Sequence, residues 1–246
     1  MKVSFLLAGK SRRMGDLTLH KSKALIPVGG RPIFEYSLSN FVSNNPLELV
    51  PVLGYRNEEL LEFIESKSKN LKVTPAYNMD FETTNNMYSL YQAKDLLYGE
   101  EFILCNGDVI YNKGIVDEIF RYKGKSAVML DQVNKYKVID SPKTIVRDNK
   151  ILDLGRHIEL ERNFGYAIGL YKFNKELSKA LFDQIEKMLA KGLVNAGFHD
   201  PLIDLFNLYE VLPASTKGLL WTDIDEPDDI PKAEEIYYKL NTEQGI

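Results

Sequence analysis

The chain has 246 residues, of which 44% are hydrophobic and 27% are charged, and this is enough to bury the core of one large α/β domain. Its net charge of −4 argues against a general nucleic-acid binder, and no apolar segment is long enough to span a bilayer. The single cysteine, Cys105, excludes an internal disulfide and is typical of a reducing compartment, so we expect a cytoplasmic protein.

In the first half of the chain, short apolar runs alternate with segments of helical periodicity. This alternation is typical of crossover units on a mostly parallel sheet. The predicted strands are Val3–Leu7, Leu49–Leu53, Leu71–Pro75 and Phe102–Cys105. The predicted helices begin with Pro32 as first helical residue, with Asn57 as the cap of Glu58–Ser66, and near Asn85 or Asn86.

The second half begins with a predicted helix at Ile115–Tyr122 and then becomes rich in short β-type runs separated by turns. The predicted strands here are Ala127–Leu130, Tyr136–Ile139, Thr144–Arg147, Lys150–Leu154 and Tyr166–Phe173. Asn174 is the predicted cap of a long helix, Asp200-Pro201 opens another, and a last strand at Leu219–Thr222 leads into a C-terminal helix. We expect an α/β fold with a Rossmann-like, mostly parallel mixed sheet flanked by helices and a small antiparallel β appendage.

The first strand runs directly into Gly9-Lys10-Ser11-Arg12-Arg13-Met14-Gly15, and a second basic segment extends from Lys23 to Pro32. Small residues allow backbone N–H groups to approach a ligand, and several cations lie beside them, so we expect a polyphosphate site. The segment is not a Walker A loop, because Ser4 stands where that motif needs its first glycine. It is not a dinucleotide-binding G-x-G-x-x-G either, because Ser11 takes the second glycine position and Gly15 falls one residue late.

These two segments together resemble the two-part signature of the nucleotidyltransferases, L-x-A-G-x-[GS]-x-R-M-G and P-K-x-L-x-P-[VL]-x-G-[KR]-P. The matching residues are Leu6, Ala8, Gly9, Ser11, Arg13, Met14 and Gly15 in the first part, and Lys23, Leu25, Pro27, Gly30, Arg31 and Pro32 in the second. Ser22 departs from the pattern, which usually has proline there. The resemblance continues in Phe102–Asp108, a strand that ends in Gly-Asp, and in Trp221–Asp229, which is similar to W-x-[DE]-I-D-x-P-x-D.

The resemblance implies a nucleotide-diphospho-sugar transferase type of fold and a single domain over 1–246. Residues 1–110 would bind the nucleotide, and 111–246 would bind the acceptor and supply the second metal ligand. Asp108 and Asp225 are the implied ligands of Mg²⁺, the implied cofactor, because a divalent cation held by carboxylates brings two polyanions together. Arg13 is expected on the β- and γ-phosphates and Lys23 at the α-phosphate.

Two segments in the middle of the chain resemble particular families within the nucleotidyltransferases. Ala76–Leu90, with its Asn-Asn-x-Tyr-Ser run, and Leu154–Phe173 are similar to segments of LicC-type phosphocholine cytidylyltransferases and of phosphonate cytidylyltransferases. The expected partners are therefore CTP and a small phosphorylated or phosphonate acceptor. The expected nucleotide-binding residues are Leu7, Ala8, Gly9, Ser11, Arg13, Lys23, Asn78 and Asn85, and the expected acceptor-binding residues are Asn86, Tyr88 and Arg156.

Two alternatives remain open from the sequence. One is a nucleotidyltransferase that uses another NTP with a sugar 1-phosphate or a molybdenum cofactor, and the other is a non-catalytic nucleotide-binding regulator. The joint presence of Arg13, Lys23, Asp108 and Asp225 argues against the regulator. The histidines at 20, 157 and 199 lack metal-ligand spacing, and we expect no catalytic role for them. The sequence does not indicate an oligomeric state.

Overall fold

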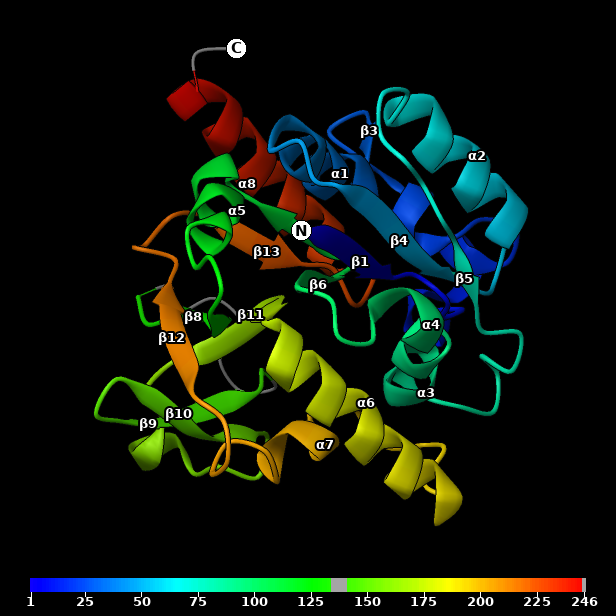
Figure 1. Ribbon diagram of the computed structural model, residues 1–246. Coiled ribbons are helices and arrows are strands. Elements are labelled where there is room, and N and C mark those ends of the chain that lie inside the picture. Colours follow the sequence, from blue (N-terminus) through cyan, green and yellow to red (C-terminus); the bar gives the residue numbers. More distant parts are fainter. Residues whose placement is uncertain (134–140, 245–246) are drawn as a thin grey trace.

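The computed structural model describes residues 1–133 and 141–244, and a mixed sheet lies at its centre (Figure 1). In this part of the chain the sheet has nine strands, seven of them in the order β10-β9-β11-β6-β1-β4-β5, with β8 beside β11 and β12 beside β8. The strands are β1 (Lys2–Leu6), β4 (Glu48–Leu53), β5 (Ala76–Tyr77), β6 (Phe102–Asn106), β8 (Ser126–Asp131), β9 (Lys143–Arg147), β10 (Lys150–Gly155), β11 (Tyr166–Phe173) and β12 (Val211–Ser215).

Helices cover both faces of this sheet. The α-helices are α1 (Ile33–Ser43), α2 (Asn57–Lys67), α3 (Asn86–Tyr91), α4 (Lys94–Leu97), α5 (Lys113–Phe120), α6 (Lys175–Ala190), α7 (Asp200–Ile203) and α8 (Asp229–Gln244). Short 3₁₀ helices are η1 (Arg12–Thr18), η2 (Lys23–Leu25) and η3 (Leu160–Arg162). The mixed sheet with helices on both sides confirms the predicted fold class.

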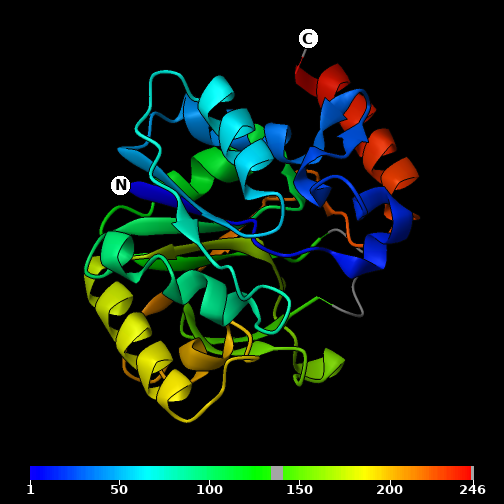
Figure 2. The same cartoon turned by 90° about the vertical axis from the view of Figure 1, so that its right-hand side faces the viewer.

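Alternation of side chains along the central strands divides the core into two layers. Val3 and Phe5 of β1 pack with α1, α2 and α5, whereas Val50 and Val52 of β4 pack with α3, α4, α6 and α7. The two helical layers stand on opposite sides of the sheet in both views (Figures 1 and 2). A third cluster lies beneath α8, where Ile236 packs near the β2–β3 hairpin.

The parallel and antiparallel regions form one continuous sheet. β1 pairs in parallel with β4 and with β6, while β11 pairs antiparallel with β6 and with β8. The antiparallel strands that the sequence assigns to an appendage are therefore joined to the parallel half through β11. The predicted strand Tyr136–Ile139 lies outside the described residues.

Two small antiparallel sheets lie outside the main one, and the sequence pattern predicted neither as paired strands. β2 (Pro27–Val28) and β3 (Arg31–Pro32) form a hairpin whose turn residues, Gly29 and Gly30, both have positive φ, as a two-residue hairpin turn requires. β7 (Val109–Tyr111) pairs with β13 (Trp221–Asp223).

Several predicted boundaries are wrong. The strand predicted at Leu71–Pro75 pairs only as a bridge between Val73 and Leu49, and β5 begins after Pro75, which has no N–H to continue the ladder. Pro32 has an extended ψ of 138° as part of the hairpin, so α1 begins one residue later.

Two helix starts and the last strand also differ from the prediction. Asn57 is the first residue of α2, and its side chain donates to the Gly54 carbonyl instead of capping the helix. The helix predicted at Ile115 begins two residues earlier, because Asn112 accepts a hydrogen bond from the Gly114 N–H and caps it there. The last strand, expected at Leu219–Thr222, is β13.

Candidate active site

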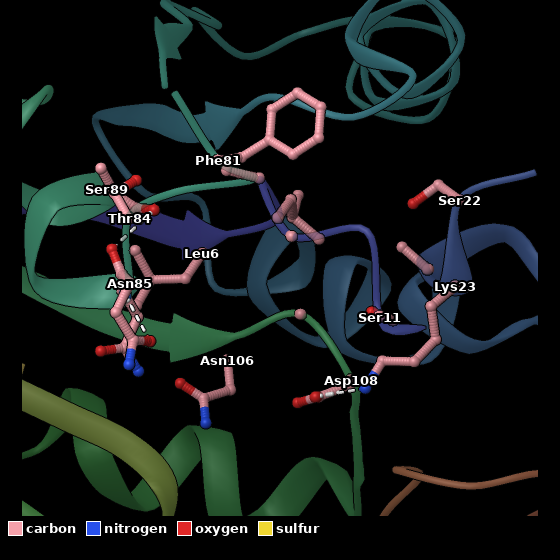
Figure 3. Close-up of a pocket in the computed structure, with 16 residues that line it drawn as sticks. Leu6, Ser11, Ser22, Lys23, Phe81, Thr84, Asn85, Ser89, Asn106 and Asp108 are labelled. Atoms are coloured by element: carbon pink, nitrogen blue, oxygen red, sulfur yellow. Dashed lines mark hydrogen bonds and ion pairs between the residues drawn. The ribbon is translucent and has the colours of Figure 1, made fainter. Parts of the chain in front are cut away.

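The candidate site lies where the parallel strand order reverses. β1 has β4 on one side and β6 on the other, so the carboxyl ends of these strands leave a crevice between their outgoing loops, where ligands of open α/β sheets bind. A pocket of about 220 Å³ occupies this place, with walls made by the segments that follow β1 and β6 (Figure 3). Cys105, one residue before the end of β6, is buried in the core.

The loop after β1 brings main-chain atoms to the pocket. The predicted residues Leu7, Ala8, Gly9 and Ser11 all line it. A Cβ added at Gly9 would meet no protein atom within 4 Å, so the space beside this backbone is open to a ligand. Ser11 adopts the left-handed conformation, with φ 54° and ψ 56°, and it turns the chain into η1 at the pocket wall.

Beside this loop, two cations and two carboxylates from distant parts of the chain meet. The Lys23 Nζ lies 2.6 Å from the Asp108 Oδ2 and 3.6 Å from the Asp225 Oδ1, and it donates to the Ile224 carbonyl at 2.8 Å. Arg13 contacts the same Asp225 oxygen at 3.1 Å. The Lys23 side chain is 11% exposed and each carboxylate 26%, whereas the Arg13 side chain is 63% exposed. The structure thus brings together the four residues predicted as catalytic.

The β7–β13 ladder sets the relative position of the two carboxylates. Asp223 pairs with Val109, and the Ile224 N–H donates to the Asp108 carbonyl at 3.0 Å. At the other end of this segment, the Asp229 carboxylate accepts hydrogen bonds from the N–H groups of Asp225 and Glu226, at 2.7 and 2.9 Å. Asp225 is therefore held between a strand and the start of α8.

The donor set fits a magnesium ion that a substrate helps to hold. Among the described residues, no group of three or more His, Cys, Asp or Glu side chains could hold a metal ion on its own. Mg²⁺ is commonly bound by one or two carboxylates, with phosphate oxygens and waters completing its shell. Asp108 and Asp225 supply oxygen donors of this kind. Asp108 lines both this pocket and a second, larger cleft, and Asp225 lines the cleft.

That second cleft has a volume of about 1350 Å³ and shares Asn85, Asn86, Asn106 and Asp108 with the first pocket. Arg156, predicted to bind the acceptor, is exposed and lines this cleft. A ligand in the cleft and a ligand in the pocket would therefore meet beside Asp108.

Two aromatic side chains on the cleft wall were not anticipated from the sequence. Tyr171 and His199 share a hydrogen bond of 2.6 Å between the hydroxyl and Nε2. Burial, with a smaller effect of the nearby Arg156 charge, lowers the pKa of His199 from 6.5 to about 3, and burial raises the pKa of Tyr171. His199 is thus neutral at physiological pH. The sequence did not reveal that His199 lines the cleft, because this position depends on how α7 packs.

The asparagines divide between the site and the scaffold. Asn85 caps α3 by accepting from the Asn86 N–H at 2.8 Å, and both residues line the pocket and the cleft. Asn78, predicted to bind the nucleotide, is 1% exposed and lines neither. Its amide makes hydrogen bonds to Thr84, Ser89 and Asp80. The prediction that Asn78 contacts the nucleotide directly therefore does not fit its position, and its side chain belongs to the scaffold.

Tyr88, predicted to bind the acceptor, also lies away from both pockets. Its hydroxyl contacts the Asp80 carboxylate at 3.3 Å. One residue along α3 turns the side-chain direction by about 100°, and it is the next residue, Ser89, that lines the pocket. Of the predicted residues in the Asn-Asn-x-Tyr-Ser run, Asn85 and Asn86 line the pocket and Tyr88 does not.

Several pocket residues were missed by the sequence reasoning. They include Phe81, Thr84, Ser89 and Asn106. Asn106 directly precedes the Gly-Asp pair at the end of β6, and Ser89 ends the Asn-Asn-x-Tyr-Ser run, so proximity to a motif was the available signal. Thr84 and Phe81 come from the loop between β5 and α3, which has no periodicity to reveal an inward face.

Within the described residues, no helix has both the length and the apolar character needed to cross a membrane.

Comparisons with known proteins place this geometry in context. The family model described as Nucleotidyl transferase matches residues 4–142, more than half of the chain. The bifunctional protein GlmU of Methanococcus maripaludis is 27% identical over 95% of this chain and 53% of its own length. The CMP-5'-(3-aminopropyl)phosphonate synthase of Streptomyces rubellomurinus is 24% identical over 93% of this chain and 37% of its own length. The chain thus spans about half the length, or less, of these relatives.

Two solved structures share the fold over almost their whole length. The inositol-1-phosphate CTP transferase from T. maritima has a TM-score of 0.83 at 18% identity, with 98% of this chain and 96% of that chain covered. The CTP:phosphocholine cytidylyltransferase LicC from Streptococcus pneumoniae has a TM-score of 0.80 at 21% identity, with 96% and 98% covered. At these identities the likeness concerns the fold alone.

Proposed function

This chain belongs to the nucleotidyl transferase family, and on that premise we propose that it is a cytidylyltransferase. It transfers CMP from CTP to an oxygen of a small phosphorylated or phosphonate acceptor and releases pyrophosphate. The observation that carries the proposal is the convergence of Lys23, Asp108, Asp225 and Arg13 at the junction of the pocket of about 220 Å³ and the larger cleft.

The charges of the pocket orient the nucleotide. The triphosphate lies at the end that carries Gly9, Ser11 and Lys23, because backbone N–H groups and an ammonium favour phosphate oxygens. Lys23 contacts the α-phosphate. Arg13 reaches the β- and γ-phosphates, since a guanidinium has about five donors and its ion pair with Asp225 uses one nitrogen.

The acceptor enters from the larger cleft, where Arg156 binds its phosphate or phosphonate group. Asp108 and Asp225 would hold Mg²⁺ between the two substrates, and the ion supplies charge neutralisation on the phosphate oxygens when bound. The chain's own contribution is to keep two carboxylates and two cations in fixed positions before the substrates arrive.

The transfer needs no general base. A phosphate monoester loses its second proton with a pKa of about 6, so the acceptor oxygen is already a nucleophile at neutral pH. This oxygen forms a bond to the α-phosphorus, the bond from that phosphorus to its bridging oxygen breaks, and pyrophosphate leaves with the electron pair. Lys23 stabilises the charge that develops on the α-phosphate oxygens.

CTP is favoured as the donor by the segment around Asn85 and Tyr88, which resembles the cytidylyltransferases, and by relatives whose names refer to CMP or CTP. Transfer to a sugar phosphate is the second candidate, since a glucose-1-phosphate thymidylyltransferase from Bacillus anthracis shares the fold at a TM-score of 0.80. A non-catalytic regulator is the third.

Pyrophosphate release tests these candidates directly. Each NTP is offered with phosphocholine, 2-aminoethylphosphonate, inositol 1-phosphate or glucose 1-phosphate, in Mg²⁺ or in EDTA. We expect release from CTP with a phosphate monoester or phosphonate acceptor, and none in EDTA. Turnover with UTP or GTP but not CTP would refute the cytidylyl assignment, and release from no pair would favour a regulator.

The Asp108→Asn variant tests the site assignment. We expect metal-dependent release to fall by about 10²-fold or more, the scale for loss of a catalytic electrostatic group, while circular dichroism shows that the variant is folded. Asp16→Asn is the matched control, because Asp16 is exposed on η1 and lines neither pocket. Normal release by Asp108→Asn would remove this carboxylate from the site.

A further inference from the structure

The end of the pocket opposite the cations is where a base would lie. Figure 3 shows Lys23, Ser11 and Asp108 on one side of the pocket, and Phe81, Thr84 and Ser89 on the other. If the triphosphate lies at the first side, the second side faces the base. This placement rests on the proposed nucleotide transfer, and it makes the second side the part of the pocket that chooses the base.

The hydroxyls at this end are oriented by a buried amide. The Asn78 Nδ2 donates to the Thr84 Oγ1 at 3.0 Å and to the Ser89 Oγ at 2.9 Å. Its Oδ1 accepts from the Asp80 N–H at 3.0 Å. Because a backbone N–H can only donate, this bond fixes which end of the amide is oxygen and which is nitrogen. Both hydroxyls therefore receive a hydrogen bond from Asn78.

The two hydroxyls differ in where their own hydrogens go. Thr84 donates to the Asp80 carbonyl at 2.8 Å, an ordinary length. Ser89 faces the Asn85 carbonyl at 3.4 Å, beyond the range of about 2.5–3.0 Å for O–H···O bonds. Ser89 is 7% exposed and lines the pocket. Its hydroxyl hydrogen is thus weakly held and can be redirected to a ligand, while Asn78 occupies one of the two lone pairs of the oxygen.

From this arrangement we propose that the Ser89 hydroxyl donates its weakly held hydrogen to ring N3 of the cytosine base, and that Asn78 is the positioning residue that orients the Ser89 hydroxyl. Cytosine N3 carries a lone pair, whereas uracil N3 carries a hydrogen. A hydroxyl that donates at this place therefore pairs with cytosine N3 but not with uracil N3. Sites built around one hydrogen bond discriminate strongly against a base that leaves it unpaired.

Equilibrium binding of CTP and UTP without acceptor tests this assignment. We expect the wild-type protein to prefer CTP, and Ser89→Ala to weaken CTP binding by about fivefold to tenfold, the effect of one neutral hydrogen bond, with UTP unchanged or improved. Thr83→Ala is the matched control, because Thr83 is a neighbouring exposed hydroxyl that lines neither pocket. It should leave the CTP to UTP ratio unchanged.

A substrate analogue makes the same test on the unaltered protein. 3-Deaza-CTP has a C–H in place of N3, so the wild-type protein should bind it about fivefold to tenfold more weakly than CTP. Ser89→Ala should bind CTP and 3-deaza-CTP equally, because the Ser89 hydroxyl and ring N3 are the two partners of one hydrogen bond, and removing either loses the same bond. A further loss of 3-deaza-CTP binding in Ser89→Ala would refute the pairing.

Asn78→Asp reverses the direction of the hydrogen bond between residue 78 and Ser89. A carboxylate accepts from Ser89, so the hydroxyl would present its lone pair to the base, and the CTP to UTP ratio should fall further than in Ser89→Ala. Melting curves identify folded variants, and the 3-deaza-CTP measurement remains decisive should this variant not fold.

The outcomes separate this inference from the proposed transfer. Cytosine preference that depends on Ser89, without turnover, supports the base assignment and refutes the transfer. Turnover from CTP with a ratio that Ser89→Ala leaves unchanged, or no preference between CTP and UTP in the wild-type protein, refutes the base assignment.

Discussion

Replacing Lys23 with methionine removes one charge and keeps most of the side-chain volume. The lost ammonium makes short contacts with Asp108 and with the Ile224 carbonyl, and a longer one with Asp225. The Coulomb attraction across 2.6 Å is about 6 kcal/mol at an effective dielectric of about 20. Most of this is offset by desolvation of the ammonium, and hydrogen bonds to charged groups contribute about 1.5–3 kcal/mol net.

Because each carboxylate is about a quarter exposed, water replaces part of what is lost. We expect Lys23→Met to lower the free energy of unfolding by about 2 kcal/mol, which corresponds to about 4–8 °C in melting temperature for a chain of this size. Lys21→Met is the control, since this lysine is exposed two residues away and lines neither pocket. Urea unfolding followed by fluorescence of Trp221 measures the difference.

The same variant separates a catalytic lysine from a structural one. Loss of charge stabilisation at the α-phosphate should lower pyrophosphate release by about 10²- to 10³-fold. Mg²⁺ alone should raise the melting temperature more in Lys23→Met than in the wild-type protein, because the ammonium no longer competes for the two carboxylates. Wild-type stability together with wild-type turnover would show that Lys23 is a solvated loop cation and refute the reasoning.

Two glycines, the histidine of the cleft wall and the single cysteine each allow a further test. Gly9→Ala should melt like the wild-type protein, because its Cβ meets no protein atom, but it should bind nucleotide more weakly. Gly54→Ala should lose about 1–3 kcal/mol of stability, since its Cβ would lie 2.6 and 2.7 Å from the backbone oxygens of Ala8 and Asn78. Equal melting temperatures of the two variants would contradict this. The unfolded state protonates His199 near pH 6.5 while the folded pKa is about 3, so stability should fall as the pH drops from about 6.5, with a slope of at most about 1.4 kcal/mol per pH unit. His199→Gln retains a partner for Tyr171 and should show a shallower slope in urea titrations at several pH values. Burial raises the pKa of the Cys105 thiol, so a thiol reagent should label it only under unfolding conditions, and rapid labelling of the native protein would be inconsistent with its position.

The parallel half of the fold was predictable because its strands are continuous apolar runs. β1, β4 and β6 begin and end within one residue of the predicted ranges. β12 was not among the predicted strands. Its Pro213 is tolerated since this strand pairs only with β8 in the described residues. β2, β3 and β7 were not predicted, since strands of two or three residues are too short to show an alternation of side chains.

For the candidate site, the sequence was a better guide to which segments of the chain line the pocket than to which individual side chains do. Lys23, Asp108 and Asp225 come together as expected because each belongs to a motif at the end of a strand or the start of a short helix. Asn78 was predicted to bind the nucleotide but is buried outside the pocket, and Ser89, which lines the pocket, was not among the predicted residues. Which residues of α3 face the pocket depends on how this helix packs against the sheet.

The bond from Lys23 to the Ile224 carbonyl joins positions 201 residues apart. A ribosome would have made most of the polypeptide before this contact could close, and pairing over such a separation is entropically late. The N-terminal crevice can therefore exist in partly folded molecules that have no completed catalytic centre. Turnover would then depend on this long-range contact as well as on the pocket, and a destabilised variant could retain nucleotide binding while losing turnover.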